Sequence, residues 1–548
     1  MKIALAQLNP TIADLSGNAE KIYKAANEAH SQGAALAIFP ELSLCAYPPR
    51  DLLLREWFIR DVVSAAKALA KHSKQMPFVF GAPWPSPYPE GKPLVNAAIL
   101  ARDGKIEKFF PKKLLPEYDV FDERRYFEPG REKKPNVFGV GKTRFGVTIC
   151  EDLWEETNEL GHLLHAHSPS PTSLLKGKCD ILLNLAASPF HLGKYKLRQA
   201  VLQKAARILK KPVLYVNQVG GHDDLLFDGR SQAIGANGKN RFQLKAFDEE
   251  LYIYDTEARS KSAPAILHDP GEIQLLRQAL VLGLRDYFRK TGFQKAVLGL
   301  SGGIDSALVA ALAAEALGPD KVTCVTMPSP YSSTGSVDDS VDLAKRLGIH
   351  LDNISIAEVM DVFGESLKAP FGEQPSGLAW ENLQSRIRGN VLMAYANREN
   401  ALVLNTGNKS ELAMGYCTLY GDMNGGLSVL GDLTKTRVYA LARHFNSKKE
   451  VIPRAIIDKE PSAELRPGQK DTDSLPPYDV LDPIVEALVE ENVSAETLVK
   501  RGFKKDLATS VIRKFEINEY KRFQSPPILK VTSKAFGPGR RIPLARKF

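Results

Sequence analysis

One short segment of this 548-residue sequence combines glycine, serine and aspartate in a pattern that suits a bound phosphate. It runs from Gly299 to Ser306 and reads GLSGGIDS. Ser301, Gly302 and Gly303 let the backbone approach an anion, and a helix starting behind them offers unpaired N–H groups and the positive end of its dipole. The loop lacks the lysine of a Walker A sequence and the spacing of GxGxxG. A turn that merely caps a helix is the alternative interpretation.

Three reactive side chains stand just past apolar runs in the first half of the chain. Glu41 lies in FPELSL, Lys112 in FFPKKLLPEYDVFDERRYFEPG, and Cys150 in GVTICEDLW. A thiol with a pKa of about 8.5 is mostly protonated at neutral pH, so a base such as Glu41 must take its proton during attack on an amide carbonyl. Lys112 can stabilise the oxyanion that develops. A core thiol, a helix cap and a surface lysine are the ordinary alternatives.

The segments around these residues alternate between strand and helix, which predicts α/β layers with sites at the carboxyl ends of strands. In the first half we expect strands over 3–8, 144–149, 180–187 and 213–217, an apolar run over 34–39, and helices over 17–32 and 194–209. In the second half we expect strands over 295–300, 321–327, 349–356 and 401–405, and helices over 271–290, 304–317 and 336–347.

The length exceeds what one core usually organises, so several domains are expected. The strand and helix pattern lapses between about 242 and 270, where the sequence becomes charged and includes RSKSAP. We therefore predict a first domain over 1–245, a connector over 246–269 and a second domain over 270–548.

The composition is that of an ordinary folded protein, with 44% hydrophobic and 25% charged residues. The net charge is +9, but Lys and Arg are spread along the chain, so we expect no nucleic-acid partner. The five cysteines include no CxxC pair, which disfavours a disulfide framework or a zinc site. Apolar runs long enough to cross a membrane are lacking, and a cytoplasmic location is expected.

The two motifs resemble two known families. SGGIDS resembles the pyrophosphate signature of the N-type ATP pyrophosphatases, and Glu41, Lys112 and Cys150 resemble the triad of the nitrilase superfamily. Lys112 is chosen over Lys113 because the family lysine lies six residues before the tyrosine matched by Tyr118. The resemblance implies a nitrilase-like α-β-β-α sandwich followed by a Rossmann-like (adenine nucleotide alpha hydrolase-like) parallel-sheet domain. It further implies glutamine contacts and auxiliary acids, namely Tyr118, Ser188 and Lys194 for glutamine and Glu117 and Glu151 as acids.

The two halves together resemble the family of glutamine-dependent NAD synthetases. Besides SGGIDS, the resemblance rests on ENLQSRIRGN (381–390), NTGNKSELAMGYCTLYGDMNGG (405–426), EPSAELRPGQKDTDSLPPYDVLD (460–482) and NEYKRFQSPPILKVTSKAFGPGRR (518–541). It implies that the chain adenylylates deamido-NAD with ATP and Mg²⁺, amidates it with ammonia from glutamine, and forms a homo-oligomer.

The same resemblance implies residue roles in the second domain. The residues that contact ATP are Gly299, Leu300, Ser301, Gly302, Gly303, Ile304, Asp305, Ser306, Thr406 and Lys435. Those for deamido-NAD are Asn382, Arg386, Glu411 and Lys521, and the metal ligands are Asp305 and Glu411. An ordinary charged helix face is the alternative for Arg386 and Arg388. At the level of the whole chain, the alternatives are amidation of a different carboxylate and a protein that senses nucleotide without turnover.

Overall fold

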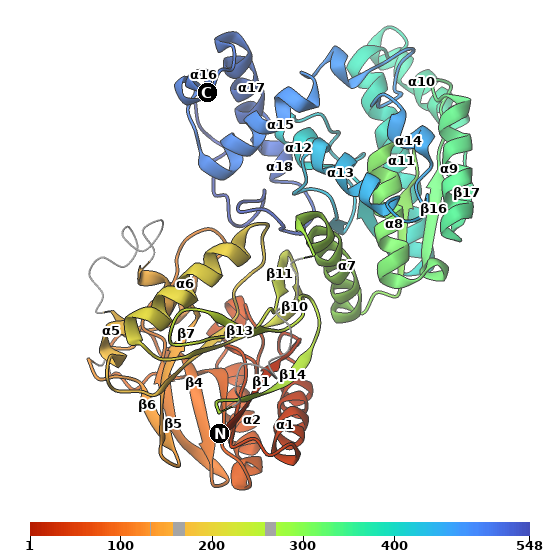
Figure 1. Ribbon diagram of the computed structural model, residues 1–548. Coiled ribbons are helices and arrows are strands. Elements are labelled where there is room, and N and C mark those ends of the chain that lie inside the picture. Colours follow the sequence, from red (N-terminus) through yellow and green to blue (C-terminus); the bar gives the residue numbers. More distant parts are fainter. Residues whose placement is uncertain (132, 157–169, 258–269, 548) are drawn as a thin grey trace. The chain divides into compact units, whose positions relative to one another are not determined.

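The computed structural model describes residues 1–131, 133–156, 170–257 and 270–547. The chain divides into two compact units, Met1–Pro270 and Gly271–Phe548, which are drawn in Figure 1. Within the described part of the chain, every helix is too short or too polar to span a membrane.

The first unit contains two six-stranded sheets. The strands of one sheet, in spatial order, are β14 (Glu250–Asp255), β1 (Lys2–Gln7), β2 (Leu36–Ile38), β3 (Phe78–Pro85), β4 (Leu94–Arg102) and β5 (Lys105–Pro111). Those of the other are β13 (Asn240–Gln243), β12 (Gln232–Ile234), β9 (Val213–Asn217), β8 (Ile181–Ala186), β7 (Thr143–Ile149) and β6 (Val137–Val140). A separate hairpin joins β10 (Val219–His222) to β11 (Leu225–Asp228).

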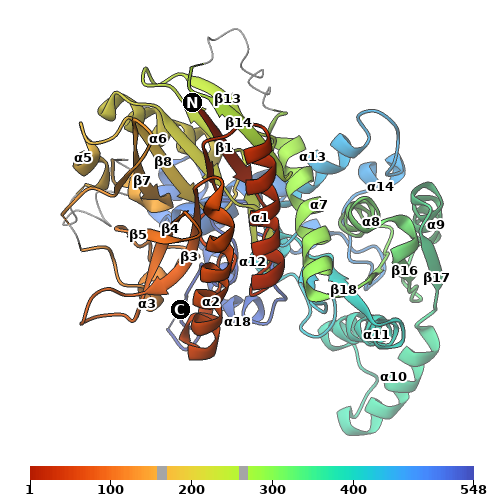
Figure 2. The same cartoon turned by 90° about the horizontal axis from the view of Figure 1, so that it is seen from below.

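Helices cover the outer faces of these two sheets. The helices α1 (Leu15–Ser31) and α2 (Glu56–Ala70) lie along the sheet of β1, and α5 (Pro171–Leu175) and α6 (Lys194–Leu209) lie along the sheet of β8 (Figure 2). Helix α1 buries Ile22, Ala26 and Ala29, which share one helical face. The inner faces of both sheets share one core, which includes Leu5 and Val147. The expected α-β-β-α sandwich is therefore confirmed.

Strand β14 differs from our expectation that residues 246–269 form only a connector. It pairs antiparallel with β1 over six residues, from Glu250 opposite Gln7 to Asp255 opposite Lys2. Its side chains alternate, so that Leu251 and Ile253 pack on one core while Tyr252 and Tyr254 pack on the other. Its sequence, ELYIYD, contains a run of apolar and aromatic residues that suits a strand, whereas the charged residues on either side of it are typical of a connector. Residues 258–269 of the expected connector lie outside the described residues.

The second unit is built on a fully parallel five-stranded sheet. In spatial order its strands are β17 (His350–Asn353), β16 (Val322–Thr326), β15 (Lys295–Gly299), β18 (Ala401–Asn405) and β19 (Leu427–Ser428). The strands that follow β15 in the chain are added first on one side of it, as β16 and β17, and then on the other side, as β18 and β19. The α/β proteins place ligands at such a switch in strand order. The Rossmann-like parallel-sheet fold is thus confirmed.

Some helices of the second unit surround the parallel sheet, and others form a separate cluster. Those around the sheet are α7 (Glu272–Thr291), α8 (Ile304–Leu317), α9 (Thr334–Leu347), α10 (Ala357–Phe371), α11 (Gly377–Glu399), α13 (Lys435–Phe445) and α14 (Arg454–Asp458). The cluster contains α12 (Lys409–Met414), α15 (Tyr478–Glu486), α16 (Ala495–Lys500), α17 (Lys505–Ile517) and α18 (Glu519–Arg522). Helix α8 is apolar on nearly every side and packs between α7, α13 and the sheet.

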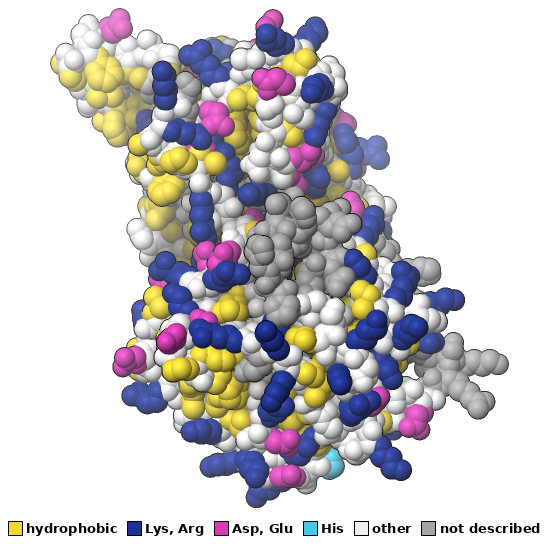
Figure 3. Space-filling view, turned by 90° about the vertical axis from the view of Figure 1, so that its left-hand side faces the viewer, with side chains coloured by type: hydrophobic (Ala, Val, Ile, Leu, Met, Phe, Trp, Pro, Cys, Tyr) yellow, Lys and Arg dark blue, Asp and Glu magenta, His cyan; other side chains and the backbone are white. Residues whose placement is uncertain are grey.

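The basic excess of the sequence is not gathered into one patch on the face drawn in Figure 3. Lys and Arg side chains are scattered there among acidic and uncharged ones. This distribution agrees with the spread of these residues along the chain and suits a solvated surface.

The pairing of β14 with β1 predicts that a fragment ending at residue 245 is less stable than one ending at residue 257. Removing β14 exposes the apolar surface under Leu251 and Ile253 and leaves one edge of β1 unpaired. The free energy of unfolding should fall by about 3 kcal/mol or more, as measured by urea denaturation of the two fragments. Equal urea midpoints would contradict this placement of β14.

Candidate active sites

The first candidate site contains a buried lysine between two buried carboxylates. The Nζ of Lys112 lies 2.8 Å from Glu41 Oε1 and 2.7 Å from Glu123 Oε1, and all three side chains are at most 4% exposed. Burial lowers the pKa of Lys112, but the charges of Glu123 and Glu41 outweigh burial and hold that pKa well above its usual range. Lys112 is therefore a permanent cation beside the two carboxylates.

Backbone and amide groups orient Glu41 within this cluster. Asn96 on β4 donates to Glu41 Oε1 at 2.7 Å, and the backbone N–H of Ala187 donates to Glu41 Oε2 at 3.0 Å. The loop that carries Glu41 lies directly against β3 at Gly81, where an added Cβ would come 2.1 Å from the backbone nitrogen of Leu42. Only glycine permits this approach, so the packing of the loop against β3 fixes the position of Glu41.

Glu123 is a site residue that the sequence did not single out. It opens the short helix α3 (Glu123–Tyr126) and accepts hydrogen bonds from Tyr47 at 3.1 Å and Asn96 at 3.3 Å. Burial raises its pKa to about 7, although Lys112 acts in the opposite direction. Glu117, an expected auxiliary acid, lies instead on the surface beside Arg124. The string LPEYDVFDE holds both glutamates, and only the path of the loop distinguishes them.

Cys150 stands where β7 ends, as the first residue of a short 3₁₀ helix (Cys150–Glu156). Its φ of +40° is a strained value for a non-glycine residue. The turn is held by Asp152, whose carboxylate accepts the backbone N–H groups of Ile149, Lys113 and Leu114, each at 2.9 Å. Burial, followed by the charge of Glu41, raises the pKa of the Cys150 thiol well above its usual range. The thiol is thus neutral until a base accepts its proton.

The residues expected to contact glutamine are Tyr118, Ser188 and Lys194. The hydroxyl of Tyr118 donates to the carboxylate of Glu151 at 3.1 Å, and Ser188 is buried past the end of β8. Lys194 begins α6, with its Nζ 5.5 Å from the centre of the Trp154 ring. These side chains come from two segments, 115–123 and 184–194, and their assigned roles stay predictions.

The second candidate site is the predicted phosphate loop. β15 ends at Gly299, Gly303 is the N-cap of α8, and Ser306 at the start of α8 bonds back to Gly303 O at 3.0 Å. Gly302 has a φ of +75°, and a Cβ there would lie 2.4 Å from Ser336 O on α9. Glycine is therefore required at this position, and the N–H groups of the loop and helix are arranged for an anion.

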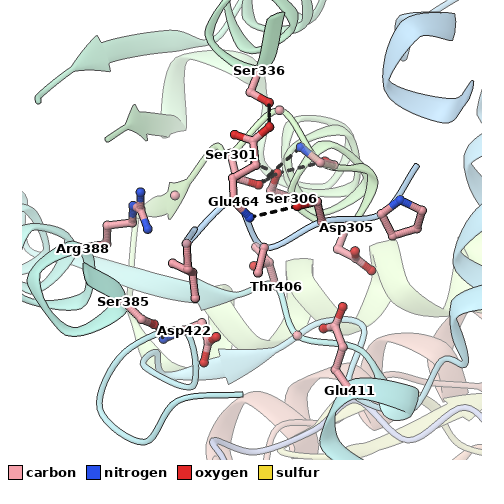
Figure 4. Close-up of a pocket in the computed structure, with 18 of the residues that line it drawn as sticks. Ser301, Asp305, Ser306, Ser336, Ser385, Arg388, Thr406, Glu411, Asp422 and Glu464 are labelled. Atoms are coloured by element: carbon pink, nitrogen blue, oxygen red, sulfur yellow. Dashed lines mark hydrogen bonds between the residues drawn. The ribbon is translucent and has the colours of Figure 1, made fainter. Parts of the chain in front are cut away.

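The loop borders a pocket of about 630 Å³, a size typical of small-molecule sites. The pocket is lined by all eight loop residues together with Thr406, Glu411 and Lys435. Figure 4 shows Arg388 and Ser385 on the side of the pocket opposite Asp305 and Glu411. The expected ATP residues therefore meet in one cavity.

A second lysine lies between two carboxylates in this pocket. The Nζ of Lys435 lies 2.5 Å from Asp305 Oδ2 and 3.3 Å from Glu411 Oε1. Burial raises the pKa of Glu411 to about 8 despite the opposing charge of Lys435. Two carboxylates that converge on one cation fit Mg²⁺, which binds through one or two carboxylates and keeps water or phosphate as its other ligands.

Three of the residues expected to bind deamido-NAD do not line the pocket. Asn382 accepts a hydrogen bond from Thr418 at 2.7 Å, and Arg386 donates to Leu419 O at 3.2 Å. Lys521 donates to Gly415 O and Cys417 O, both at 2.8 Å. All three hold the segment 415–419, which follows α12 and contributes Tyr416 and Cys417 to the pocket wall. Their predicted contact with the dinucleotide stays a prediction.

Other side chains enter the pocket although no role was assigned to them from sequence. Arg388 is partly exposed at the pocket wall. Partial desolvation lowers the pKa of its guanidinium to about 10, and its Nε donates to Met327 O at 3.0 Å. Desolvation by the surrounding protein raises the pKa of Asp422 to about 6, and its carboxylate accepts the backbone N–H of Thr418 at 2.6 Å. Glu464 accepts hydrogen bonds from Ser333 and Ser336 at the N-terminus of α9. All three residues lie in the motif strings, but only the tertiary fold decides that their side chains line the pocket.

Family models and known proteins match both halves of the chain. A carbon-nitrogen hydrolase model matches residues 2–264, and an NAD synthase model matches residues 276–525. The glutamine-dependent NAD(+) synthetase of Synechocystis sp. is 46% identical over 100% of this chain and 99% of its own length. The corresponding protein of Thermotoga maritima is 40% identical, with 100% and 99% of the two chains covered.

Solved structures agree with this sequence similarity. A glutamine-dependent NAD+ synthetase from Acinetobacter baumannii, in complex with adenosine diphosphate, has 40% identity and a TM-score of 0.75, covering 99% of this chain and 98% of its own. A synthetase structure from Cytophaga hutchinsonii, with 21% identity and a TM-score of 0.83, has the same fold. The chain pairs a carbon-nitrogen hydrolase unit with a nucleotide-binding unit. It belongs to the family of glutamine-dependent NAD(+) synthetases.

The raised pKa of Cys150 predicts slow alkylation by iodoacetamide at neutral pH, because only the thiolate reacts rapidly. The rate at Cys150, followed by peptide mass spectrometry, should rise about tenfold per pH unit through pH 9 in the folded protein. The same cysteine in urea should reach a plateau near its ordinary pKa of about 8.5. A plateau below pH 8 in the folded protein would contradict the raised pKa.

Proposed function

We propose that the chain makes NAD by joining two reactions. The first unit hydrolyses glutamine to glutamate and ammonia at Cys150, and the second uses ATP to convert the carboxylate of deamido-NAD into the carboxamide. AMP and pyrophosphate are released. The observation that supports the proposal most directly is the presence of both clusters, around Lys112 and around Asp305, in a chain that matches its relatives over its whole length.

In the first unit, Cys150 attacks the amide carbonyl of glutamine while Glu41 accepts the thiol proton. A buried neutral thiol next to a carboxylate suits this proton transfer, because thiolate forms only as the carbon–sulfur bond forms. Lys112 is fixed by Glu41 and Glu123 and stabilises the negative oxygen of the tetrahedral intermediate. Glu41 then returns the proton to the amide nitrogen, which leaves as ammonia, and water hydrolyses the thioester to release glutamate and restore the Cys150 thiol.

In the second unit, the loop from Gly299 to Ser306 holds the β- and γ-phosphates of ATP at the N-terminus of α8. The carboxylate of deamido-NAD attacks the α-phosphorus, pyrophosphate leaves, and ammonia displaces AMP from the mixed anhydride. Activation is required because a carboxylate is a poor electrophile. Asp305 and Glu411 would hold Mg²⁺, which neutralises charge on the phosphates. Lys435 lies between the same two carboxylates and can turn its ammonium group toward phosphate.

Separate sites predict separate losses of activity. Cys150→Ala should abolish NAD formation from glutamine but preserve formation from ammonium, because only the first reaction needs the thiol. Asp305→Asn should stop both, since it removes a carboxylate beside the phosphate loop. The measurement is NAD, AMP and pyrophosphate production from deamido-NAD, ATP and Mg²⁺ with either nitrogen source.

Two results would contradict the proposal. Loss of ammonium-driven activity in a folded Cys150→Ala protein would show that the reactions are not divided between the units. If deamido-NAD gave no AMP with the unaltered protein, the acceptor would be a different carboxylate.

The structure also predicts which glutamate supports Lys112. Glu123→Gln should lower glutamine-driven turnover by about 10²-fold, because it removes half of the negative charge that orients the lysine. Glu117→Gln, in the same loop but on the surface, should retain the turnover of the unaltered protein. The measurement is glutamate release, and equal losses in both variants would argue against Glu123 as the second carboxylate.

A further inference from the structure

A row of buried polar side chains lies behind the amide site, and the mechanism above does not use it. It begins with Arg198 on α6 and Asp228 at the end of β11, each 1% exposed. Their contact is bidentate, with Arg198 Nη2 2.9 Å from Asp228 Oδ1 and Nη1 3.2 Å from Oδ2. Two charges removed from water cost free energy, and packed apolar side chains often serve stability as well or better. A contribution to stability is therefore a weak explanation for this buried ion pair.

Asn217 connects this ion pair to the substrate segment. It is the last residue of β9 and is completely buried. Its amide nitrogen donates to Gly229 O at 3.0 Å and lies 3.5 Å from Asp228 Oδ1. Its amide oxygen accepts the backbone N–H of Ser188 at 2.9 Å, and its nitrogen also reaches Ser188 O at 3.4 Å. One side chain thus holds both backbone groups of Ser188.

This arrangement extends the sheet beyond its last backbone pair. The parallel ladder between β8 and β9 ends with Ala186 opposite Asn217. Past that point, the side chain of Asn217 takes over the hydrogen bonds that a further strand residue would provide. The next residue along the chain, Ala187, donates its N–H to Glu41 Oε2. Residues 187 and 188 are therefore held between the catalytic carboxylate on one side and Asn217 on the other.

We propose that Asn217, oriented by Asp228 and Arg198, is a positioning residue. It holds the backbone of Ser188 in place for binding of the amide substrate, and it thereby also holds Ala187, whose N–H orients Glu41. The inference rests on the proposed glutamine-hydrolysing function of this site. An asparagine suits the role because it presents one acceptor and two donors in a fixed plane. The bond from its amide nitrogen to Gly229 O, together with the longer contact to Asp228, keeps this plane from rotating, and Arg198 fixes Asp228 through the bidentate ion pair.

The test compares Asn217→Ala with a matched control, Asn184→Ala. Asn184 is buried on β8 in the same sheet, but its amide bonds to Thr148 and not to the substrate segment. Asn217→Ala should raise the KM for glutamine about tenfold and lower kcat less, while ammonium-driven NAD formation is unchanged. Asn184→Ala should lower Tm without changing the KM for glutamine. A merely structural role for Asn217 would lower Tm alone, and that result would overturn the inference.

A second variant covers the case in which Asn217→Ala does not fold. Asn217→Asp keeps the acceptor for the Ser188 N–H but loses the donor to Gly229 O and places a carboxylate near Asp228. It should also raise the KM for glutamine, and an unchanged KM would overturn the inference. Failure of the unaltered protein to hydrolyse glutamine would instead contradict the proposed function, so the two failures are distinguishable.

Discussion

The ion cluster around Lys112 is the constraint on which the first unit depends. A buried ammonium group requires compensating charge, and Glu41 and Glu123 supply it from loops that follow β2 and β5. Removal of one partner would leave a charge uncompensated in the core, so the strands must deliver all three side chains together. The close approach at Gly81 and the hydrogen bonds from Asn96 serve this requirement.

The second unit also places a lysine between two carboxylates, but at the wall of a pocket. Lys435 lies between Asp305 and Glu411, much as Lys112 lies between two glutamates. The difference is the pocket of about 630 Å³ beside Lys435, which has the size of a small-molecule site. A sealed cation suits an oxyanion that develops briefly at a buried thiol. A cation at the edge of a cavity suits phosphates that enter and leave.

Much of both sites could be predicted because their residues are contiguous or follow recognisable strands. The segment from Gly299 to Ser306 has its chemistry and its strand and helix context in a single run. Glu41 and Cys150 each follow an apolar strand, β2 in one sheet and β7 in the other, so the α/β pattern placed each of them past the carboxyl end of its strand. The edge strand β14 was harder to recognise, because its pairing with β1 joins opposite ends of the unit.

The sequence by itself therefore determined the two chemistries, the two α/β units and the residues that directly follow their strands. Only the tertiary structure decided which of two neighbouring side chains enters a site. Glu123 is buried while Glu117 is not, and Arg388 lines the pocket while Arg386, two residues earlier on α11, points to Leu419. Residue type and spacing are local properties, but the direction of a loop or helix face is set by distant packing partners.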